Sequence, residues 1–378
     1  VVVGLPFFAL ATTSPTLQMW FAATDHPRAQ DPYFLYAAGN VGSVGALLAY
    51  PLLMEPLFSL RTQAQIWAGG YAAFVMAMLA ASLWAARRPT MVESPSASPA
   101  SERVAVEHGG RRTWLLLSFV PSVLMLGITL HIATDIASFP LLWIVPLVLY
   151  LSTFIIAFAS DSARRIRILG TTVWFSALPV AALSFVGDRW TGLVAGLHLA
   201  WFFCAALLCH SKLAAARPST ERLTEYYLFL SIGGALGGVF ASLVAPLVFA
   251  AVLEYPIGIA LALVVARKPE RLGLPSWARV AVGVSGVLIA AAVLLIPTQI
   301  LIWVIAIAIV AFVLRGAPGT ILVLSAALMA GPALLHGGED VLRARSFFGV
   351  YTVVEQGGVR ELVSGTTVHG SQLMRESG

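Results

Sequence analysis

Residues 113–130 are TWLLLSFVPSVLMLGITL, and they open a longer stretch, Thr113 to Val265, in which apolar runs alternate with short arginine-bearing breaks. Runs of about 18 or more apolar residues are typical of helices that cross a membrane. The runs are continuous, whereas the strands of a membrane β-barrel alternate apolar and polar residues. The stretch therefore predicts an all-α polytopic membrane protein.

The composition supports the same class. The chain has 378 residues, of which 59% are hydrophobic and 11% are charged. Soluble domains contain about 25% charged residues. The net charge of +5 comes from cations in short loops between apolar runs, where the positive-inside bias accounts for them. We therefore expect the lipid bilayer, and no nucleic acid, as a partner.

Short polar breaks divide the apolar residues into predicted spans. The segment Gln18–Asp31 is polar and amphipathic, and we expect it at a membrane interface. The predicted spans are Val1–Ala11, Tyr33–Met54, Ile66–Trp84, Trp114–Leu130, Ile136–Ala159, Leu169–Val186, Leu193–Leu208, Tyr226–Phe249, Ala251–Val265, Val280–Ile296, Ile300–Leu314 and Thr320–Leu335.

The span pattern predicts five regions. We expect residues 1–86 to hold the last spans of a first half, 113–266 a second half, and 267–336 additional membrane helices. Residues 87–112, rich in Ser, Pro and Glu, predict a flexible linker, and its arginines favour the cytoplasm. Residues 337–378 predict the start of a soluble β-domain. If all three of the last apolar runs cross the membrane, the C-terminus lies on the side opposite the linker. If one of them does not cross, the C-terminus lies on the linker's side, and the sequence leaves both alternatives open.

The C-terminal segment has short β-branched and aromatic runs around Gly357 and Gly358, a hairpin-type turn signal. We predict strands at Gly349–Glu355 and Val359–Ser364, and a third at Thr366–Val368. A lone hairpin is marginal in water, so we expect this piece to belong to a larger domain and the chain to be a fragment.

Several segments resemble bacterial membrane proteins in which a major-facilitator-like bundle is fused to a spermidine synthase-like domain. They are LPFFALATTSPTLQMWF (5–21), DPYFLYAAGNVGSVGALLAYPLLMEP (31–56), ATDIASFPLLWIVPLVLYLSTFIIAF (133–158), LTEYYLFLSIGGALGGVF (223–240), RSFFGVYTV (345–353) and RELVSGTTVHGSQ (360–372).

This resemblance implies a bacterial inner membrane location and a major-facilitator-like bundle. It also implies the small β-domain that precedes an aminopropyltransferase catalytic domain. Gln372 matches the glutamine near the substrate end of that β-domain. The co-substrate would be decarboxylated S-adenosylmethionine, or S-adenosylmethionine for a methyltransferase-like variant. We expect no catalysis from residues 1–378 alone, because the cofactor loop and general base of such a domain would follow them.

Two ionisable positions stand out in the predicted bundle. Asp135 lies four residues after His131, so on one helix they would share a face and bind a cation or exchange a proton. The alternative is that both belong to the wet turn between two spans. Glu225 opens a span beside Tyr226, and together they would suit a cation. The alternative is a carboxylate that only favours the helix N-terminus.

The remaining candidates are weaker. Asn40 is a candidate for lining a cavity of the first half. Cys204, Cys209 and His210 lack a fourth ligand, so we expect no metal site. Two overlapping small-xxx-small pairs predict close helix packing: Gly233, Gly234, Gly237 and Gly238.

Three functions follow as hypotheses. The membrane part would anchor or serve an aminopropyltransferase-like domain of polyamine metabolism. Alternatively, it would carry polyamines or other organic cations by alternating access, with ligand near the midplane. The third hypothesis is a membrane scaffold that transports nothing.

Overall fold

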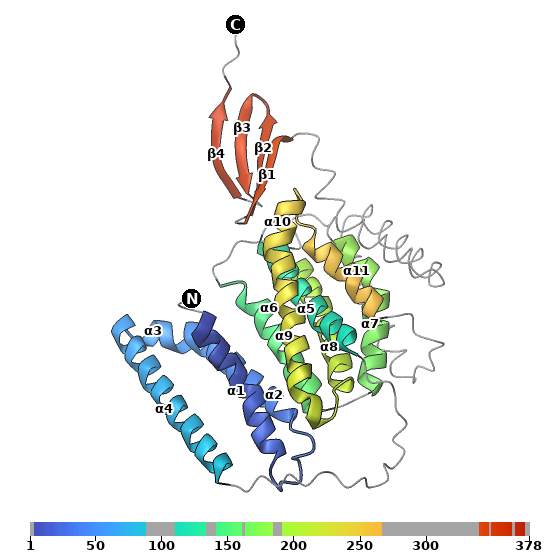
Figure 1. Cartoon of the computed structure of the whole chain (residues 1–378). Coiled ribbons are helices and arrows are strands. Elements are labelled where there is room, and N and C mark those ends of the chain that lie inside the picture. The colour runs from blue at the N-terminus through green and yellow to red at the C-terminus, as the bar shows by residue number, and fades with distance from the viewer. Residues whose placement is uncertain are drawn as a thin grey trace.

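The computed structural model is a helical bundle with a small antiparallel sheet at one end (Figure 1). It describes residues 4–87, 110–133, 141–160, 163–183, 191–266, 340–347, 349–364 and 367–374. Five helical segments within these ranges are long and apolar enough to cross a membrane: Phe34–Leu57, Leu60–Ala86, Arg111–His131, Gly192–Ala215 and Thr220–Val248. The mainly helical, apolar fold predicted from the sequence is therefore confirmed, and the three predicted spans after Ala266 lie outside the described residues.

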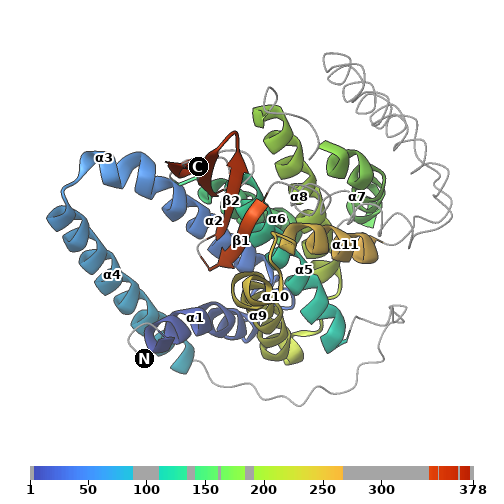
Figure 2. The same ribbon diagram turned by 90° about the horizontal axis from the view of Figure 1, so that it is seen from above.

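The N-terminal group of elements lies to one side of the bundle (Figures 1 and 2). Its elements are α1 (Gly4–Ala22), α2 (Phe34–Ala49), the π-helical turn η1 (Tyr50–Met54), α3 (Glu55–Leu57) and α4 (Leu60–Ala86). In both views α4 stands apart from the other helices, and Trp67 on it is 65% exposed.

The predicted span Val1–Ala11 ends too early, because helix α1 continues to Ala22. The hydroxyls of Thr12, Thr13 and Thr16 donate to backbone carbonyls three or four residues earlier in the same helix. Such internal hydrogen bonds satisfy the threonine hydroxyls within the helix.

The second group forms the buried core. Its elements are α5 (Arg111–His131), α6 (Ile144–Ala159), α7 (Ala163–Ala182), α8 (Thr191–Ala215), the 3₁₀ turn η5 (Thr220–Arg222), α9 (Leu223–Val239), the π-helical turn η6 (Phe240–Val244), α10 (Ala245–Val248) and α11 (Glu254–Ala266). Helix α5 is central, because it contacts α6, α8, α9 and α11. Its residues Val120, Val123, Leu124 and Ile128 have no exposed surface.

Small residues bring the backbones of this group together. A Cβ at Gly237 would lie 2.7 Å from the carbonyl oxygen of Phe119, and one at Gly233 would overlap the carbonyl of Leu115. A Cβ at Gly234 or Gly238 would meet nothing within 4 Å. Of the four glycines in the predicted packing motif, Gly233 and Gly237 thus lie against α5. The other two face away from it.

The C-terminal sheet has the strand order β1-β2-β3-β4, with all neighbours antiparallel. Its strands are β1 (Asp340–Ser346), β2 (Gly349–Gln356), β3 (Val359–Ser364) and β4 (Thr367–Leu373). Gly357 and Gly358 have φ of +60° and +77°, a conformation that glycine adopts readily, so the predicted hairpin turn is confirmed. Strand β4 is longer than predicted. Strand β1 was not predicted, since its arginines obscure the alternation.

The bundle has two chemically different ends. At the first, α4 ends and α5 begins, and we call it the linker-side end. Here Trp114 Nε1 donates to the carbonyl of Ala216, and Lys212 Nζ to that of Val265. The opposite, sheet-side end holds the end of α5, the turn between α10 and α11, and the sheet (Figure 1).

Candidate functional site

Polar side chains inside an apolar bundle are costly to bury and mark functional candidates. Three groups of polar side chains stand out among the described residues. One is a group of tyrosines at the linker-side end, one is a histidine between α6 and α8, and one is a cluster at the sheet-side end.

Four tyrosines join the N-terminal helices to the second group. Tyr33 and Tyr36, which open α2, pack against Tyr226 and Tyr227, which open α9, with ring centroids 5.2 to 6.0 Å apart. The hydroxyl of Tyr33 donates to the carbonyl of Pro218 at 3.0 Å. The tyrosines therefore fasten two parts of the chain together.

Tyr226, a predicted cation contact, lies within this group. It has no exposed surface, and its hydroxyl donates to the carbonyl of Leu213 at 2.9 Å. The hydroxyl of Tyr227 donates to Gln18 Oε1 at 2.7 Å, which ties α1 to α9. Both phenol groups thus have intramolecular acceptors.

The other predicted residues at this end also have intramolecular partners. The carboxylate of Glu225 binds both Arg111 and Arg222, the latter with Nε 2.8 Å from Oε2. The Asn40 amide donates to the carbonyl of Tyr36, one turn earlier on α2, at 2.8 Å. In this conformation Glu225 is neutralised by two arginines before any external cation arrives.

His210 is buried between α6 and α8. The Thr153 hydroxyl donates to the carbonyl of Tyr150 at 2.6 Å, so its oxygen accepts from His210 Nδ1 at 2.7 Å. This assigns the proton to Nδ1 and leaves Nε2 as a lone-pair acceptor without a hydrogen-bond partner in the described ranges. The ring stacks on Phe154, with centroids 3.6 Å apart. Cys204 and Cys209 are free thiols, and no metal-binding group occurs among the described side chains.

The sheet-side cluster contains His131, His198 and Tyr255, contributed by α5, α8 and α11. His198 Nδ1 lies 3.1 Å from the Tyr255 hydroxyl, and His131 stacks on the Tyr255 ring, with centroids 5.3 Å apart. The two imidazole rings are 5.1 Å apart, edge to face. His131 thus ends α5 inside a packed cluster, while its predicted companion Asp135 lies outside the described residues.

Sequence reasoning missed His198 and Tyr255. His198 has no exposed surface although it lies in a predicted span, and an ionisable residue within an apolar run is a default candidate for function. That signal was available. The contact with Tyr255 was not, because 57 residues separate the two.

Two helices, one in each group, are broken in corresponding ways. Helix α2 passes into π turn η1 and short α3, whereas α9 passes into π turn η6 and short α10. Pro56 and Pro246 each follow their π turn by two residues. The following Phe58 and Phe249 are extended, with φ, ψ of −125°, 138° and −111°, 132°. Proline lacks an N–H and clashes with the preceding turn, which breaks a regular α-helix.

The carbonyls freed at the two breaks have different partners. In the N-terminal group, Gln63 Nε2 donates to the carbonyls of Phe58 at 2.9 Å and Met54 at 3.3 Å. In the second group, Arg345 of β1 donates to the carbonyls of Phe249 and Ala251 and forms an ion pair with Glu254. The side chains of Arg345 and Glu254 are 3% and 1% exposed. The C-terminal sheet is thereby fastened to the bundle by a buried charge pair.

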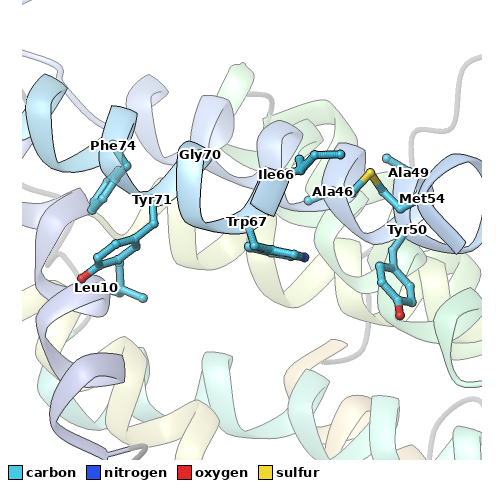
Figure 3. A pocket seen from close by; sticks show the side chains of 10 residues that line it. All are labelled: Leu10, Ala46, Ala49, Tyr50, Met54, Ile66, Trp67, Gly70, Tyr71 and Phe74. Carbon is cyan, nitrogen blue, oxygen red and sulfur yellow. The ribbon is translucent and has the colours of Figure 1, made fainter. Parts of the chain in front are cut away.

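A groove of about 440 Å³ separates α4 from α1 and α2 (Figure 3). Its lining is almost wholly apolar, so it suits a lipid chain or an apolar helix better than a charged ligand. The lining residues are Leu10, Ala46, Ala49, Tyr50, Met54, Ile66, Trp67, Gly70, Tyr71 and Phe74.

Gln372, the position implied by the resemblance, lies on exposed strand β4 opposite Arg360 of β3. Strand β4 is at the edge of the sheet away from β1, the strand that contacts the bundle (Figure 1).

Comparison of the chain with protein-family models, with curated proteins and with solved structures found no match.

Proposed function

We propose that this chain is a multi-pass protein of a bacterial inner membrane whose bundle carries and orients a soluble domain beginning with the C-terminal sheet. The observation that carries the proposal is the buried contact of Arg345 with Glu254 and two backbone carbonyls. A flexibly tethered domain has no need of such a contact.

The energetics of this contact favour a fixed orientation of the sheet. A buried charge is tolerated only when it is paired and hydrogen-bonded, and here one guanidinium meets three acceptors. Removing one member of a buried pair destabilises by about 3–5 kcal/mol, because the partner is left uncompensated. A sheet docked in any other orientation would leave Glu254 buried without its cation, so the pair favours this one docked orientation.

The charge distribution supports a specific orientation in the membrane. Cations gather at the linker-side end: Arg87, Arg111, Arg112, Arg164, Arg165, Arg167, Lys212, Arg217 and Arg222. Cytoplasmic loops carry such an excess of arginine and lysine. We therefore propose that the linker-side end faces the cytoplasm and that the sheet lies on the other side of the membrane.

The sequence resemblance supports an aminopropyltransferase-like identity for the soluble domain. In that case the sheet would precede a catalytic part that uses decarboxylated S-adenosylmethionine or S-adenosylmethionine, and Gln372 would lie near the polyamine substrate. The bundle would then serve this domain as an anchor.

Cysteine labelling in intact cells tests the orientation. A membrane-impermeant maleimide should label Val368→Cys on β4 before permeabilisation and Glu221→Cys in η5 only after it; both positions are exposed. The parent chain controls for the native Cys204 and Cys209. Labelling of Glu221→Cys alone in intact cells would reject the proposed orientation.

A second function, transport of polyamines or another organic cation, is favoured by the paired broken helices. Interrupted helices at corresponding positions of two halves are the best pointer to a transporter's binding site. Asp135 remains the predicted cation contact for this function. An Asp135→Asn variant should lose uptake of radiolabelled spermidine, and unchanged uptake would remove that role.

A further inference from the structure

The two broken helices have similar backbone geometry. They differ in the residue whose side chain donates to the carbonyls at the break, which we call the cap. At the first break the cap is Gln63, which lies five residues beyond Phe58 on the adjoining helix. At the second break it is Arg345, which lies 96 residues beyond Phe249 and belongs to the sheet. The first break is therefore closed by the helix that directly follows it in the chain, and the second is closed only while the sheet is docked.

The second break is also connected to the histidine cluster. Glu254, which binds Arg345, and Tyr255, which meets His198, are consecutive residues in the first turn of α11. A Cβ at Gly127 of α5 would lie 2.8 Å from the backbone nitrogen of Tyr255, so α5 and α11 touch at this turn. A displacement of the turn would be felt directly by His131 and His198.

We propose that the sheet acts as a releasable clamp on the break between α10 and α11. With Arg345 seated, residues 249–255 are held closed and Tyr255 stays on His198. When the sheet withdraws, the carboxylate of Glu254 and the carbonyls of Phe249 and Ala251 lose their cation and take up water, and the turn opens. The clamp thus couples the state of the soluble domain to one half of the bundle.

One carboxylate oxygen of Glu254 indicates that the closed state of the clamp can be released. Arg345 engages Oε1, whereas the buried Oε2 has no hydrogen-bond partner in the part of the chain that the structure describes. An incompletely satisfied buried carboxylate makes the closed state less stable than a fully bonded one. Release of the clamp is therefore easier than the burial of the pair alone would suggest.

This inference rests on the proposed role of the bundle as carrier of the sheet, and one set of measurements separates the two. Spin labels on β4 at Val368 and on α10 at Leu247, both exposed, report whether the sheet is held. A narrow distance distribution in the parent chain is expected, and a broad one would overturn the carrier role itself.

Hydrogen exchange in nanodiscs tests the clamp. Arg345→Ala and Glu254→Gln should each speed exchange of amides 249–257 by ~10-fold or more, because a buried pair is broken. Amides 54–60 at the first break should be unchanged. Gln63→Ala is the matched control. It should speed the exchange of amides 54–60 and leave the exchange of amides 249–257 unchanged.

Arg345→Ala could change exchange simply by unfolding the sheet, because Arg345 belongs to β1. Glu254→Gln changes no residue of the sheet, so it controls for that explanation. Unchanged exchange of amides 249–257 in Glu254→Gln, or equal acceleration at both breaks, would overturn the clamp even if the spin-label distance in the parent chain is narrow.

Discussion

The segments α2–η1–α3 and α9–η6–α10 are two solutions to one local problem. Both contain a π turn followed two residues later by proline, and both end at an extended phenylalanine. Pro51 and Glu55 around the first are half-buried and exposed, whereas the corresponding Ala241 and Ala245 around the second are buried. Leu57 and its counterpart Leu247 are exposed at both breaks. Similar local geometry thus accompanies different packing, and the difference lies in what the rest of the chain brings to each break.

The largest effect should come from removing the cap of the second break. Arg345→Ala should lower stability of the docked state by about 3–5 kcal/mol, since Glu254 is left buried without its cation. Steric trapping in bicelles, with one trap on the sheet, measures this. In a double-mutant cycle with Glu254→Gln, the combined loss should be well below the sum of the single losses. Additive losses would show that the pair contributes nothing.

The next effect concerns the glycines that precede each break. Gly237→Ala should destabilise by about 1–3 kcal/mol, because the new methyl would lie 2.7 Å from the carbonyl oxygen of Phe119. Gly42→Ala on α2 is the matched control. It meets nothing within 4 Å and should stabilise by about 0.5–1 kcal/mol through helix propensity. Unfolding free energies measured in the same bicelles should therefore move in opposite directions, and equal changes would contradict the packing difference.

A smaller loss is expected at the histidine cluster behind the second break. Tyr255→Phe removes the hydroxyl beside His198 Nδ1 and should destabilise by about 1–2 kcal/mol, since a buried ring nitrogen loses its partner. Tyr71→Phe on exposed α4 serves as control and should be neutral. Nitrogen chemical shifts of His198 should change only in Tyr255→Phe. A neutral effect there would indicate that water replaces the hydroxyl.

The smallest effect should come from the cap of the first break. Gln63→Ala should destabilise by about 0.5–1 kcal/mol, because Phe58 is 38% exposed and water can reach its surroundings. Exchange of amides near Phe58 should rise while the sheet stays docked. If Gln63→Ala released the sheet, the two breaks would be coupled and the contrast between them would fail.

Much of the helical architecture was predictable from local sequence. Hydropathy located the cores of the helices from Tyr33 to Val265, and Gly357-Gly358 located the hairpin, because both signals come from neighbouring residues. Hydropathy misplaced the end of α1, since threonine hydroxyls bond back to their own helix. It also missed β1, whose arginines resemble a loop.

The candidate site was much less predictable. His131 was singled out for its charge and spacing, yet its neighbours His198 and Tyr255 come from other helices. Glu225 was singled out as a cation contact, and its arginine partners include Arg111, which lies 114 residues away.

By itself, the sequence determined a helical, apolar protein with a β-hairpin near its end and cations on alternate loops. Hydrophobic periodicity and turn chemistry are properties of adjacent residues, so they can be judged without the fold. Only the tertiary structure decided that Arg345 caps Phe249 and meets Glu254, and that Gly237 touches α5 while Gly42 does not. It also decided that the sheet lies at the end of the bundle opposite the end of α4. These depend on pairings between distant residues, for which a single sequence has no local signal.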